Sequence, residues 1–510
     1  MKMHSSSEIE IAKRLPYDKG VPRINGPTIY GASPGRDFLY LIPVRGERPL
    51  RFSLKGGLPS GLSLDPSKGI VTGKAQEKGI FGLTVCVENR LGKTERGFTI
   101  IIGENRLART PLLGWCSWNA YGRAVSAERV MKTAEALVEK GLTARGYSYI
   151  NIDSCWQGNR LKGSGLQANE KFPDMKALVD GIHALGLKAG IYSTPMVIAY
   201  GSPVSDGPLL RGSTSFPLDP VYNDYLWGGC GKTHHEKEDA KLWAEWGFDY
   251  LKYDWPHCDI EHTRLMREAL EETNRDFIFS ITAQCKLKWF DEYKKHANML
   301  RSGNDTYDLW RLLYENAFAV EEWQEKTQPG CWYDMDMLAL GKMTCWKHCP
   351  EFTDAFKNAL PGENRLTRHE MVAHMSMWAL FPSPIQISCL LDDIDDFTLD
   401  LLSNEEILDI NQDSLGQGVS CIGKTLGQRT PDGAYDLHTR IYARPLADGS
   451  VAAGFFNLGK GAVTITLPLH AKTRIRDPWA LKDLGTFDCN FTVNVPEHGG
   501  RIFRLYGMEK

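Results

Sequence analysis

The sequence predicts a multidomain protein in which a central (β/α)8 TIM barrel is flanked by two β-sandwiches. Strand and helix patterns alternate eight times after residue 106, as a barrel of this kind requires. Both flanking regions instead carry the period-two alternation of half-buried strands. We therefore expect domains over residues 1–105, 106–412 and 413–510.

Composition supports a folded protein and argues against one class of partner. The chain has 510 residues, with 60 Lys and Arg against 63 Asp and Glu, a net charge of −3. This leaves no basic excess for binding phosphate backbones, so nucleic acid is not an expected partner. Hydrophobic content of 42% and charged content of 24% are typical of globular domains.

The first region, residues 20–103, consists of short alternating segments separated by Gly, Pro and Asp turns. Val85, Val87 and the run 98–102 show the period of two expected of half-buried strands. Its string GLPSGLSLDPSKGIVTGKAQEKG resembles an immunoglobulin-like module often found ahead of bacterial carbohydrate-active domains. We therefore expect an Ig-like sandwich that carries no chemistry of its own.

The central region begins near Leu107, where the period-two pattern of strands gives way to alternating strand and helix patterns. Ser126 can cap a helix whose apolar positions, three and four residues apart, extend to Val138, and a second amphipathic helix is expected over 175–185. No GxGxxG sequence follows a predicted strand, which argues against an open nucleotide-binding sheet. The eight strands are expected near 112–118, 147–156, 187–193, 248–254, 277–282, 298–301, 331–333 and 385–388.

The last region loses the helical period after about residue 415. Its segments again alternate between apolar and polar residues, with turns at 448–449, Gly459 and Gly461. The C-terminus therefore predicts an antiparallel β-sandwich.

Two segments bear on membranes and location. The uncharged stretch 371–391 is interrupted by Pro382, Pro384 and several polar residues, so it predicts a core helix and a buried strand rather than a membrane span. The N-terminus has no apolar h-region, so the chain as given carries no export signal. We expect a cytoplasmic protein if this chain is complete, and a periplasmic or secreted one if a signal peptide was removed.

Twelve cysteines are scattered without repeated close spacing. The tight pair Cys345 and Cys349, with His348 between them, lacks a second pair, so ordinary buried thiols are expected rather than a zinc site. No metal is predicted.

Polar residues that close barrel strands are the candidates for chemistry. Asp153 closes one strand, and Asp254 closes another with Lys252 two residues earlier on the same side. An ammonium beside a carboxylate favours its ionised form, as a nucleophile or electrostatic stabiliser requires. A buried ion pair without a catalytic role is the alternative.

Two further carboxylate clusters follow later strands. They are Asp305 with Asp308, and Asp334 with Asp336. Two carboxylates across a glycosidic bond can act as nucleophile and general acid/base, although helix caps or solvated faces would use Asp equally well. The chain also has 14 Trp, of which Trp115, Trp118, Trp156 and Trp255 fall at strand ends, where flat rings suit the apolar face of a pyranose. Most of the 14 are expected to be core residues.

Six ordered motifs between residues 107 and 510 resemble glycoside hydrolase family 27, the α-galactosidase and α-N-acetylgalactosaminidase family. The resemblance implies a retaining mechanism without metal or organic cofactor, acting on an oligosaccharide or glycoconjugate. By its pattern Asp254 would be the nucleophile and Asp305, four residues after Arg301, the acid/base. The sugar would contact Trp118, Asp153, Tyr192, Lys252, Arg301 and Asp336. The motifs are ARTPLLGWCSWNAYG, YSYINIDSCW, GLKAGIYS, AEWGFDYLKYD, CWYDMDMLALG and NEEILDINQDSLGQ.

Three positions depart from the family pattern. Ser154 stands where a second Asp usually grips the 4- and 6-hydroxyls, so restoring Asp there should raise preference for α-galactosides. Residues 281–284, including Thr282, replace a Cys-Glu-Trp segment that reads the C2 substituent. Pro256 replaces a Cys of a common disulfide, with Cys258 two residues further on.

These departures leave the sugar open. An exo-acting α-galactosidase is expected first, with β-L-arabinopyranose or N-acetylgalactosamine as alternatives. Two other classes of protein stay possible from the residues: a Schiff-base lyase or aldolase using Lys252, and a glycan-binding barrel without turnover.

Overall fold

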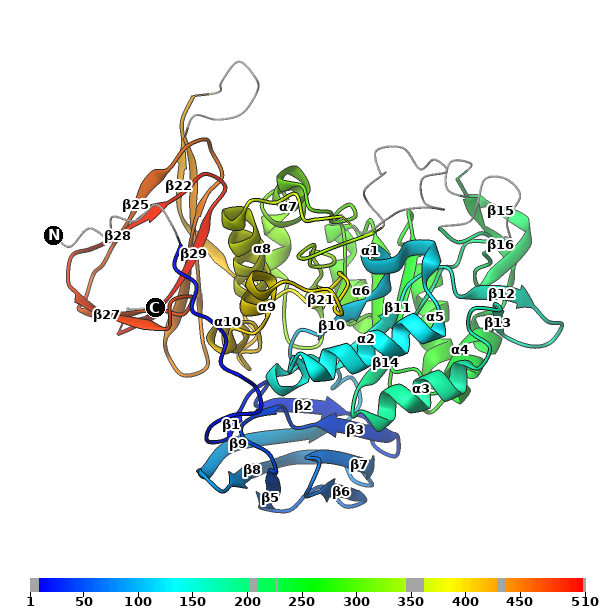
Figure 1. The fold of residues 1–510 in the computed structure, drawn as a ribbon. Helices are drawn as coiled ribbons and strands as arrows, with labels where there is room; N and C mark the ends of the chain where they lie inside the picture. The colour runs from blue at the N-terminus through cyan, green and yellow to red at the C-terminus, as the bar shows by residue number, and fades with distance from the viewer. Residues whose placement is uncertain (1–8, 201–209, 225–227, 345–361, 429–436, 508–510) are drawn as a thin grey trace.

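The computed structural model describes residues 9–200, 210–224, 228–344, 362–428 and 437–507. An eight-stranded parallel barrel occupies the centre, with the first sandwich at one end of the barrel and the last sandwich beside helix α8 (Arg368–Leu380) (Figure 1). The predicted fold class is confirmed.

The N-terminal sandwich has a four-stranded sheet in the order β2-β9-β8-β5 and a three-stranded sheet in the order β3-β7-β6, with β1 and β4 paired separately. Alternate residues of β8 and β9, such as Val85, Val87, Phe98 and Ile100, are buried between the sheets. Between them, Glu88 and Glu95 are exposed, as expected of the solvent face of a half-buried strand. The strands are β1 Arg23–Ile24, β2 Ile29–Ala32, β3 Asp37–Leu41, β4 Val44–Arg45, β5 Arg51–Lys55, β6 Leu62–Asp65, β7 Ile70–Lys74, β8 Gly79–Asn89 and β9 Gly92–Ile102.

The barrel sheet contains one strand at each of the eight predicted positions. Its order is β20-β19-β18-β17-β14-β11-β10-β21, with every pair parallel. A parallel bridge between Leu338, beyond β20, and Ile387 of β21 joins the two ends of the sheet. The strands are β10 Leu113–Cys116, β11 Tyr149–Ile152, β14 Lys188–Ser193, β17 Tyr250–Trp255, β18 Ile278–Ala283, β19 Met299–Leu300, β20 Trp332–Tyr333 and β21 Ile385–Ile387.

Side-chain caps begin two of the barrel helices, at the predicted Ser126 and at Asp174. Ser126 Oγ accepts the backbone N–H of Arg129 at 3.3 Å, and Asp174 accepts that of Ala177 at 2.9 Å, so both predicted helices start at their expected residues. The helices are α1 Ser117–Tyr121, α2 Ala127–Glu139, α3 Met175–Ala184, α4 Glu236–Trp246, α5 Ile260–Glu272, α6 Phe290–His296, α7 Trp310–Ala317, α9 Asp396–Leu402 and α10 Glu405–Asn411.

The uncharged stretch 371–391 forms most of α8 and all of β21, as predicted, and every α8 residue from Glu370 to Leu380 is buried. This helix packs against the barrel on one side and against β24 and β29 of the last sandwich on the other. Within the described ranges, no helix is both long and apolar enough to cross a bilayer.

The C-terminal region is antiparallel, as predicted. One sheet has the order β22-β23-β24-β29-β26-β27, and β25 pairs with β28 over a core that includes Phe455, Phe491 and Phe503. The strands are β22 Ser420–Leu426, β23 His438–Pro445, β24 Val451–Asn457, β25 Val463–Pro468, β26 Thr473–Asp477, β27 Lys482–Phe487, β28 Asn490–Val495 and β29 Gly500–Tyr506.

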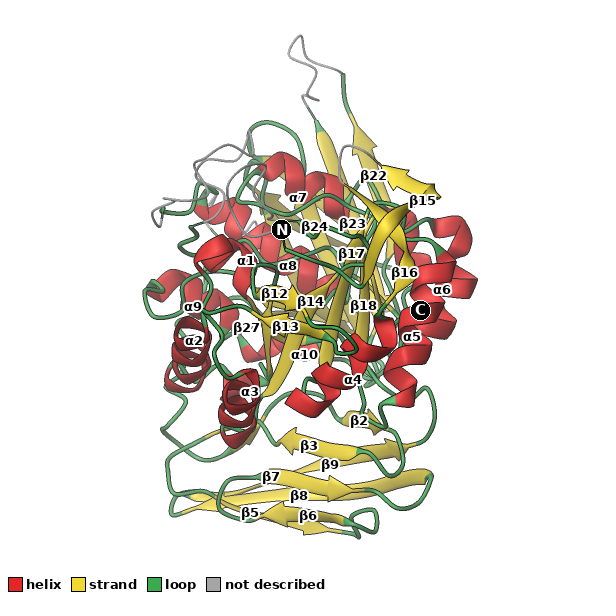
Figure 2. Ribbon diagram, turned by 90° about the vertical axis from the view of Figure 1, so that its right-hand side faces the viewer, coloured by secondary structure: helices red, strands yellow, loops and turns green. Residues whose placement is uncertain are grey.

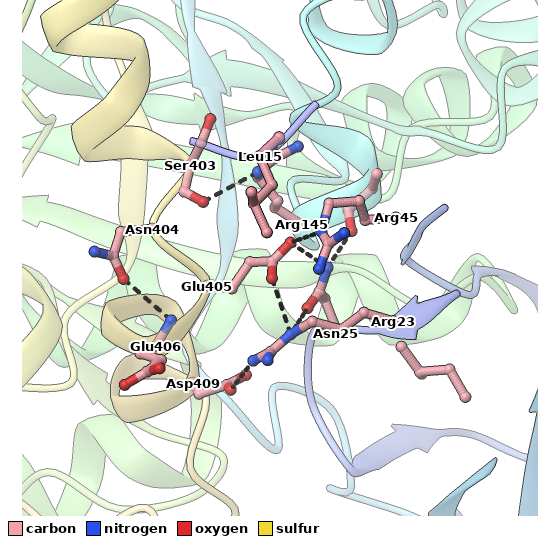
Figure 3. Close-up of polar contacts among 12 residues, drawn as sticks. Leu15, Arg23, Asn25, Arg45, Arg145, Ser403, Asn404, Glu405, Glu406 and Asp409 are labelled. Atoms are coloured by element: carbon pink, nitrogen blue, oxygen red, sulfur yellow. Dashed lines mark hydrogen bonds and ion pairs between the residues drawn. The ribbon is translucent and has the colours of Figure 1, made fainter. Parts of the chain in front are cut away.

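Helix α10 forms one polar junction between the N-terminal sandwich and the rest of the molecule (Figure 3). Glu405 accepts Arg45 Nε at 2.7 Å and pairs with Arg23 Nε at 2.9 Å. Asp409, one turn later, pairs with Arg23 Nη2 at 3.0 Å. The neighbouring Glu406 instead accepts Arg476 Nε of the last sandwich at 2.7 Å. One short helix therefore holds both flanking domains.

Arg145 adds a second link at this junction. Its side chain is buried, and burial lowers the pKa of the guanidinium. It donates to three backbone carbonyls: Leu15 at 2.6 Å, Gly141 at 2.8 Å and Ser403 at 3.0 Å. The segment ahead of the first sandwich is thereby fixed to the barrel (Figure 3).

Replacing Glu405 with Gln should destabilise the protein by about 2–3 kcal/mol, because two arginines lose a partly buried ionic acceptor. The melting temperature would show the loss. Glu95→Gln is the control, since the partners of Glu95, Lys55 and Lys93, are exposed and such pairs contribute little. Equal melting temperatures for Glu405→Gln and the parent would contradict the assigned role of this junction.

Candidate active site

The predicted site residues all lie at strand ends on one side of the barrel. Carboxyl ends of parallel barrel strands meet at the same face, so residues far apart in sequence come together there. The antiparallel pairs β12 (Gln157–Arg160) with β13 (Leu166–Ala168), and β15 (Thr214–Asp224) with β16 (Gly228–His234), follow two of these strands. Two views show β15 and β16 at the end of the barrel away from the first sandwich (Figures 1 and 2). Trp118 lies in α1 after β10, Asp153 and Ser154 after β11, Tyr192 in β14, Lys252 and Asp254 in β17, Thr282 in β18, Arg301 after β19 and Asp336 beyond β20.

A large cavity lies at the opposite end. Its volume is about 620 Å³, and it is lined by the first sandwich together with Tyr149, Lys188, Ile278 and Met299, which begin barrel strands. None of the predicted site residues lines it. Since barrel enzymes work at the carboxyl ends of their strands, we do not assign the chemistry to this cavity.

Lys252 makes its direct ion pair with Asp153 and not with Asp254. Lys252 Nζ lies 2.7 Å from Asp153 Oδ2. Burial alone would lower the pKa of Lys252, but Asp153 and then Asp254 among its neighbours raise it well above its usual value. Lys252 therefore stays charged. Asp254, which the sequence places beside Lys252 on the same strand, acts on it through a longer-range charge interaction. The partner could not be seen in the sequence because Asp153 lies on another strand.

Arg301 joins two of the later carboxylates. Its Nη2 donates to Asp305 Oδ1 at 2.8 Å, and its Nη1 lies 2.6 Å from Asp336 Oδ1. Asp336 is held in turn by the backbone N–H of Thr306 at 2.7 Å. Burial alone would raise the pKa of Asp305, but the charge of Arg301, followed by that of Lys252, lowers it.

Asp254 is in the opposite condition. The residue is buried, and no described group makes a hydrogen bond to its Oδ1. Burial raises its pKa to about 7, with Asp305 and Asp153 also raising it and Lys252 and Arg301 opposing. The two candidate catalytic carboxylates thus differ in burial and partners while they interact electrostatically.

The other two carboxylates of the predicted clusters have structural partners. Asp308 accepts three hydrogen bonds from Arg365: its backbone N–H at 2.7 Å, Nε at 3.0 Å and Nη2 at 2.6 Å. Asp334 accepts the backbone N–H of Asp336 at 2.8 Å, and burial raises its pKa to about 7. Both side chains support neighbouring residues.

Several buried polar atoms at this end have no hydrogen-bond partner among the described residues. Besides Asp254 Oδ1 they include Tyr192 Oη, Thr282 Oγ1 and Arg301 Nε. Burial, followed by Asp254 and Asp153, raises the pKa of the Tyr192 phenol, which stays protonated. Buried polar groups normally find partners, so such a group of unpaired atoms is typical of a site that binds a polar ligand.

All four tryptophans at strand ends are buried, three of them completely, whereas Trp118 is 7% exposed. Trp115 donates to Cys389 O at 2.9 Å, Trp156 to Tyr192 O at 2.8 Å and Trp255 to Asp259 Oδ2 at 2.9 Å, each ring being fully buried. Trp118 in α1 remains the candidate for sugar stacking.

Cys116, which contacts Asp153, and Tyr200, which contacts Ser154, were missed by sequence reasoning. Cys116 donates its thiol to Asp153 Oδ2 at 3.4 Å. Ser154 Oγ donates to the carbonyl of Tyr200 at 2.6 Å, and Asp153 Oδ1 accepts the Ser154 N–H at 2.7 Å. No sequence signal pointed to Tyr200, because it lies in an irregular segment after β14.

Cys258 is a free thiol, so no bridge replaces the disulfide of the family pattern at this residue. Its sulfur donates to Trp255 O at 3.2 Å and accepts the backbone N–H of Gln284 at 3.4 Å. The motif formed by Cys345, His348 and Cys349 lies outside the described residues. Among the described residues, no three His, Cys, Asp or Glu side chains group as a metal site would require.

The raised pKa of Asp254 has a consequence for stability. The folded state holds this proton more tightly than the unfolded chain, so the stabilisation is complete below the ordinary pKa near 3.8 and disappears as pH rises through about 7. Asp254→Asn, which cannot ionise, should be more stable than the parent at pH 8 by roughly 3–4 kcal/mol, and the difference should shrink towards pH 5.

Unfolding by denaturant at pH 5 and 8 measures this effect. Asp249→Asn is the matched control: burial alone would raise the pKa of Asp249, but His183 and Arg275 lower it. Its replacement should destabilise the protein at pH 8. A destabilised Asp254→Asn variant at pH 8 would contradict the electrostatic reading of the site.

Comparisons with known proteins agree with this architecture. The family model for alpha galactosidase A matches residues 110–205 and 221–413, that for the alpha galactosidase C-terminal beta sandwich domain matches 437–505, and an Ig-domain model matches 21–103. Alpha-galactosidase 2 of Arabidopsis thaliana is 32% identical over 79% of this chain and 90% of its own length. Alpha-galactosidase A of Cellvibrio japonicus is 32% identical over 70% and 78%.

A solved structure shows the same three-part fold. It is a Bacteroides fragilis protein described as a putative alpha-galactosidase, 28% identical, with a TM-score of 0.79 over 97% of this chain and 100% of that one. The resemblance seen in the sequence motifs is therefore confirmed. The chain belongs to the alpha-galactosidase A family and is a glycoside hydrolase.

Proposed function

We propose that the protein is a retaining exo-α-glycosidase that removes terminal α-D-galactosyl residues from oligosaccharides or glycoconjugates. Asp254 is the nucleophile and Asp305 the general acid/base. The observation that carries this proposal is the contrast between the two carboxylates at the carboxyl end of the barrel. Asp254 is buried with an unpaired oxygen, whereas the Asp305 side chain is 37% exposed and held by Arg301.

The reaction uses these two groups in turn. An Asp254 oxygen attacks the anomeric carbon while the bond to the leaving oxygen breaks and Asp305 transfers its proton to that oxygen. Asp305 then removes a proton from water, whose oxygen attacks the same carbon and breaks the ester bond to Asp254. The sugar leaves with its original anomeric configuration.

The position of the shared proton must change during binding. In the free protein Arg301 favours ionised Asp305, while burial favours protonated Asp254. The first step of the reaction needs a protonated Asp305 and an ionised Asp254. A sugar hydroxyl that donates to Asp254, and the positive charge that develops at the anomeric carbon, both favour its ionised form. The proton then belongs to Asp305, since the two carboxylates interact and titrate as a pair.

The sugar would be held by the charged pairs on either side. The Lys252–Asp153 pair and Arg301 with Asp336 offer donors and acceptors to sugar hydroxyls, and Trp118 offers an apolar face. Tyr192 Oη and Thr282 Oγ1, which lack partners among the described residues, would make further hydrogen bonds to the sugar hydroxyls.

A panel of nitrophenyl glycosides tests the proposal. The parent should hydrolyse the α-galactoside with the highest kcat/KM, and NMR should show the α anomer of the sugar forming first. If the parent prefers the β-L-arabinopyranoside or the α-N-acetylgalactosaminide, the proposed sugar is wrong and the proposed mechanism stands. Glycan binding without turnover would instead indicate a non-catalytic barrel, and borohydride trapping of a carbonyl substrate on Lys252 would indicate a lyase.

A further inference from the structure

The cavity between the first sandwich and the barrel has the size of a small-molecule site. Its volume of about 620 Å³ lies within the range of roughly 300–1,000 Å³ that is usual for ligand pockets, which often form between domains. Strands β2 and β3, on the side of the sandwich that faces the barrel, line one wall (Figures 1 and 2). The first residues of β11, β14, β18, β19 and β20 line the other wall, at the end of the barrel that the proposed glycosidase chemistry does not use.

Three tyrosines give this cavity an aromatic surface. Tyr30 of β2 and Tyr40 of β3 are in contact, with ring centroids 4.8 Å apart, and Tyr149 begins β11 on the barrel side. All three residues are half-buried, so protein atoms leave part of each side chain uncovered. Such rings suit an apolar, ring-shaped part of a ligand.

Lys188 brings a positive charge to the same place. Its Nζ donates to Tyr30 Oη and lies 4.8 Å from the centroid of the Tyr30 ring and 5.7 Å from that of the Tyr149 ring. Burial alone would lower the pKa of Lys188, but Tyr149, Tyr30 and Asp249 raise it above its usual value, so the ammonium keeps its proton. Within the part of the chain that the structure describes, no carboxylate oxygen lies within 4.0 Å of this ammonium, and Asp249 acts on it at longer range.

Arg109 is a second cation of the cavity that has no carboxylate partner among the described residues. Its Nη1 makes a long 3.4 Å bond to the carbonyl of Pro329, and its Nε is buried with no hydrogen-bond partner. Burial, followed by the charge of Arg106, lowers the pKa of the Arg109 guanidinium. The protein therefore compensates this positive charge poorly.

The carboxylates that line the cavity, by contrast, already have cationic partners. None of them pairs directly with Lys188 or Arg109. Charges in a partly closed site normally pair with opposite charges, and here the missing negative charge is left for a ligand to supply. The existing pairs are Asp37 with Lys74 at 3.4 Å, Asp180 with Lys176 at 2.7 Å, Asp249 with Arg275 at 2.7 Å and Asp276 with Arg36 at 3.3 Å.

We propose that this cavity binds a small organic carboxylate that carries an apolar ring. The carboxylate pairs with Lys188 through charge-assisted hydrogen bonds, Arg109 adds to the positive potential, and the ring packs among the tyrosines. A neutral sugar would leave both cations uncompensated, and inorganic phosphate would leave the ring faces uncovered. Since the ligand contacts both domains, binding also holds the first sandwich to the barrel.

Phenylacetate and its neutral counterpart phenylacetamide test the role of charge with the intact protein. Calorimetric titration should give a Kd below about 1 mM for phenylacetate and a Kd at least about 10-fold weaker for phenylacetamide, because the amide forms no charge-assisted bond. Phenylacetate should also raise the melting temperature in a saturable way, as a ligand of the folded state does. Inorganic phosphate and acetate, which lack a ring, should bind at least about 10-fold more weakly than phenylacetate.

Lys188→Met keeps most of the apolar stem and removes the charge. It should weaken phenylacetate binding about 10- to 100-fold and leave phenylacetamide binding nearly unchanged, so that the two ligands bind alike. Arg109→Gln should cost about 3- to 10-fold, and it provides a second test if Lys188→Met does not fold. Lys74→Met is the matched control: Lys74 lines the same cavity, but its side chain is 55% exposed and pairs with Asp37, so binding should change less than about 2-fold.

Asp254→Asn checks where the ligand binds. That residue lies at the opposite end of the barrel, so this variant should bind phenylacetate as tightly as the parent does. Loss of binding in Asp254→Asn, equal affinities of the parent for phenylacetate and phenylacetamide, or unchanged binding in both Lys188→Met and Arg109→Gln would each overturn the proposal. It would also be overturned if phosphate bound as tightly as phenylacetate, or if phenylacetate did not bind at concentrations up to about 10 mM.

Discussion

Asp254→Ala should lower kcat on every accepted glycoside by about a thousandfold or more, because no covalent intermediate can form without the nucleophile. Asp254→Asn should lose activity to a similar extent while gaining stability at pH 8, so that unfolding cannot explain the inactivity. Kinetics with purified protein and denaturant curves on the same samples make this comparison.

Chemical rescue identifies the role of this carboxylate. Azide added to Asp254→Gly has room to attack the anomeric carbon and should give a glycosyl azide of inverted configuration, since one displacement replaces two. An Asp254→Ala variant that keeps activity within tenfold of the parent would show that another residue is the nucleophile.

Asp305→Ala should have an effect that depends on the leaving group. With a disaccharide, whose departing oxygen is basic, kcat/KM should fall by about a thousandfold; with an activated aryl glycoside the fall should be about tenfold, because the phenolate leaves with little help from an acid. Assays of the two substrates side by side give the ratio. Asp308→Asn is the control, since Arg365 occupies that carboxylate, and any loss it causes should be equal on both substrates.

The dependence of kcat/KM on pH should also reflect the proton that Asp305 donates to the leaving oxygen. The Asp254–Asp305 pair holds one proton until the pH passes about 7, where Asp254 titrates. In the parent, kcat/KM for a disaccharide should therefore fall above pH 7, because no proton remains for the leaving oxygen. A parent profile that stays level to pH 9, or equal losses on both substrates in Asp305→Ala, would contradict the assignment of Asp305.

Ser154 shows where motif reasoning is insufficient. The family pattern has an Asp at this position. By that pattern alone, replacing Ser154 with Asp should improve α-galactoside recognition. In the structure its hydroxyl has a donor role towards the Tyr200 carbonyl that Asp cannot fill. The two expectations have opposite signs, so one variant distinguishes them.

Glu405 gives a second example, away from the site. The sequence predicts a separate first sandwich, and every candidate catalytic residue follows it. The structure ties that sandwich to α10 through Arg23 and Arg45, and ties the segment before it to Arg145. These residues belong to different domains, so local patterns carry no sign of their contact.

The sequence by itself determined the elements and the residues that end them. Strand and helix periods, the Ser126 cap and the polar residues closing apolar strands are local signals, set by backbone geometry and burial over a few positions. Only the tertiary structure decided which charges meet: Lys252 with Asp153, Arg301 with Asp336, and Ser154 with the Tyr200 carbonyl. Barrel closure brings distant strand ends together, and the environment that sets the pKa of Asp254 exists only when those ends have met.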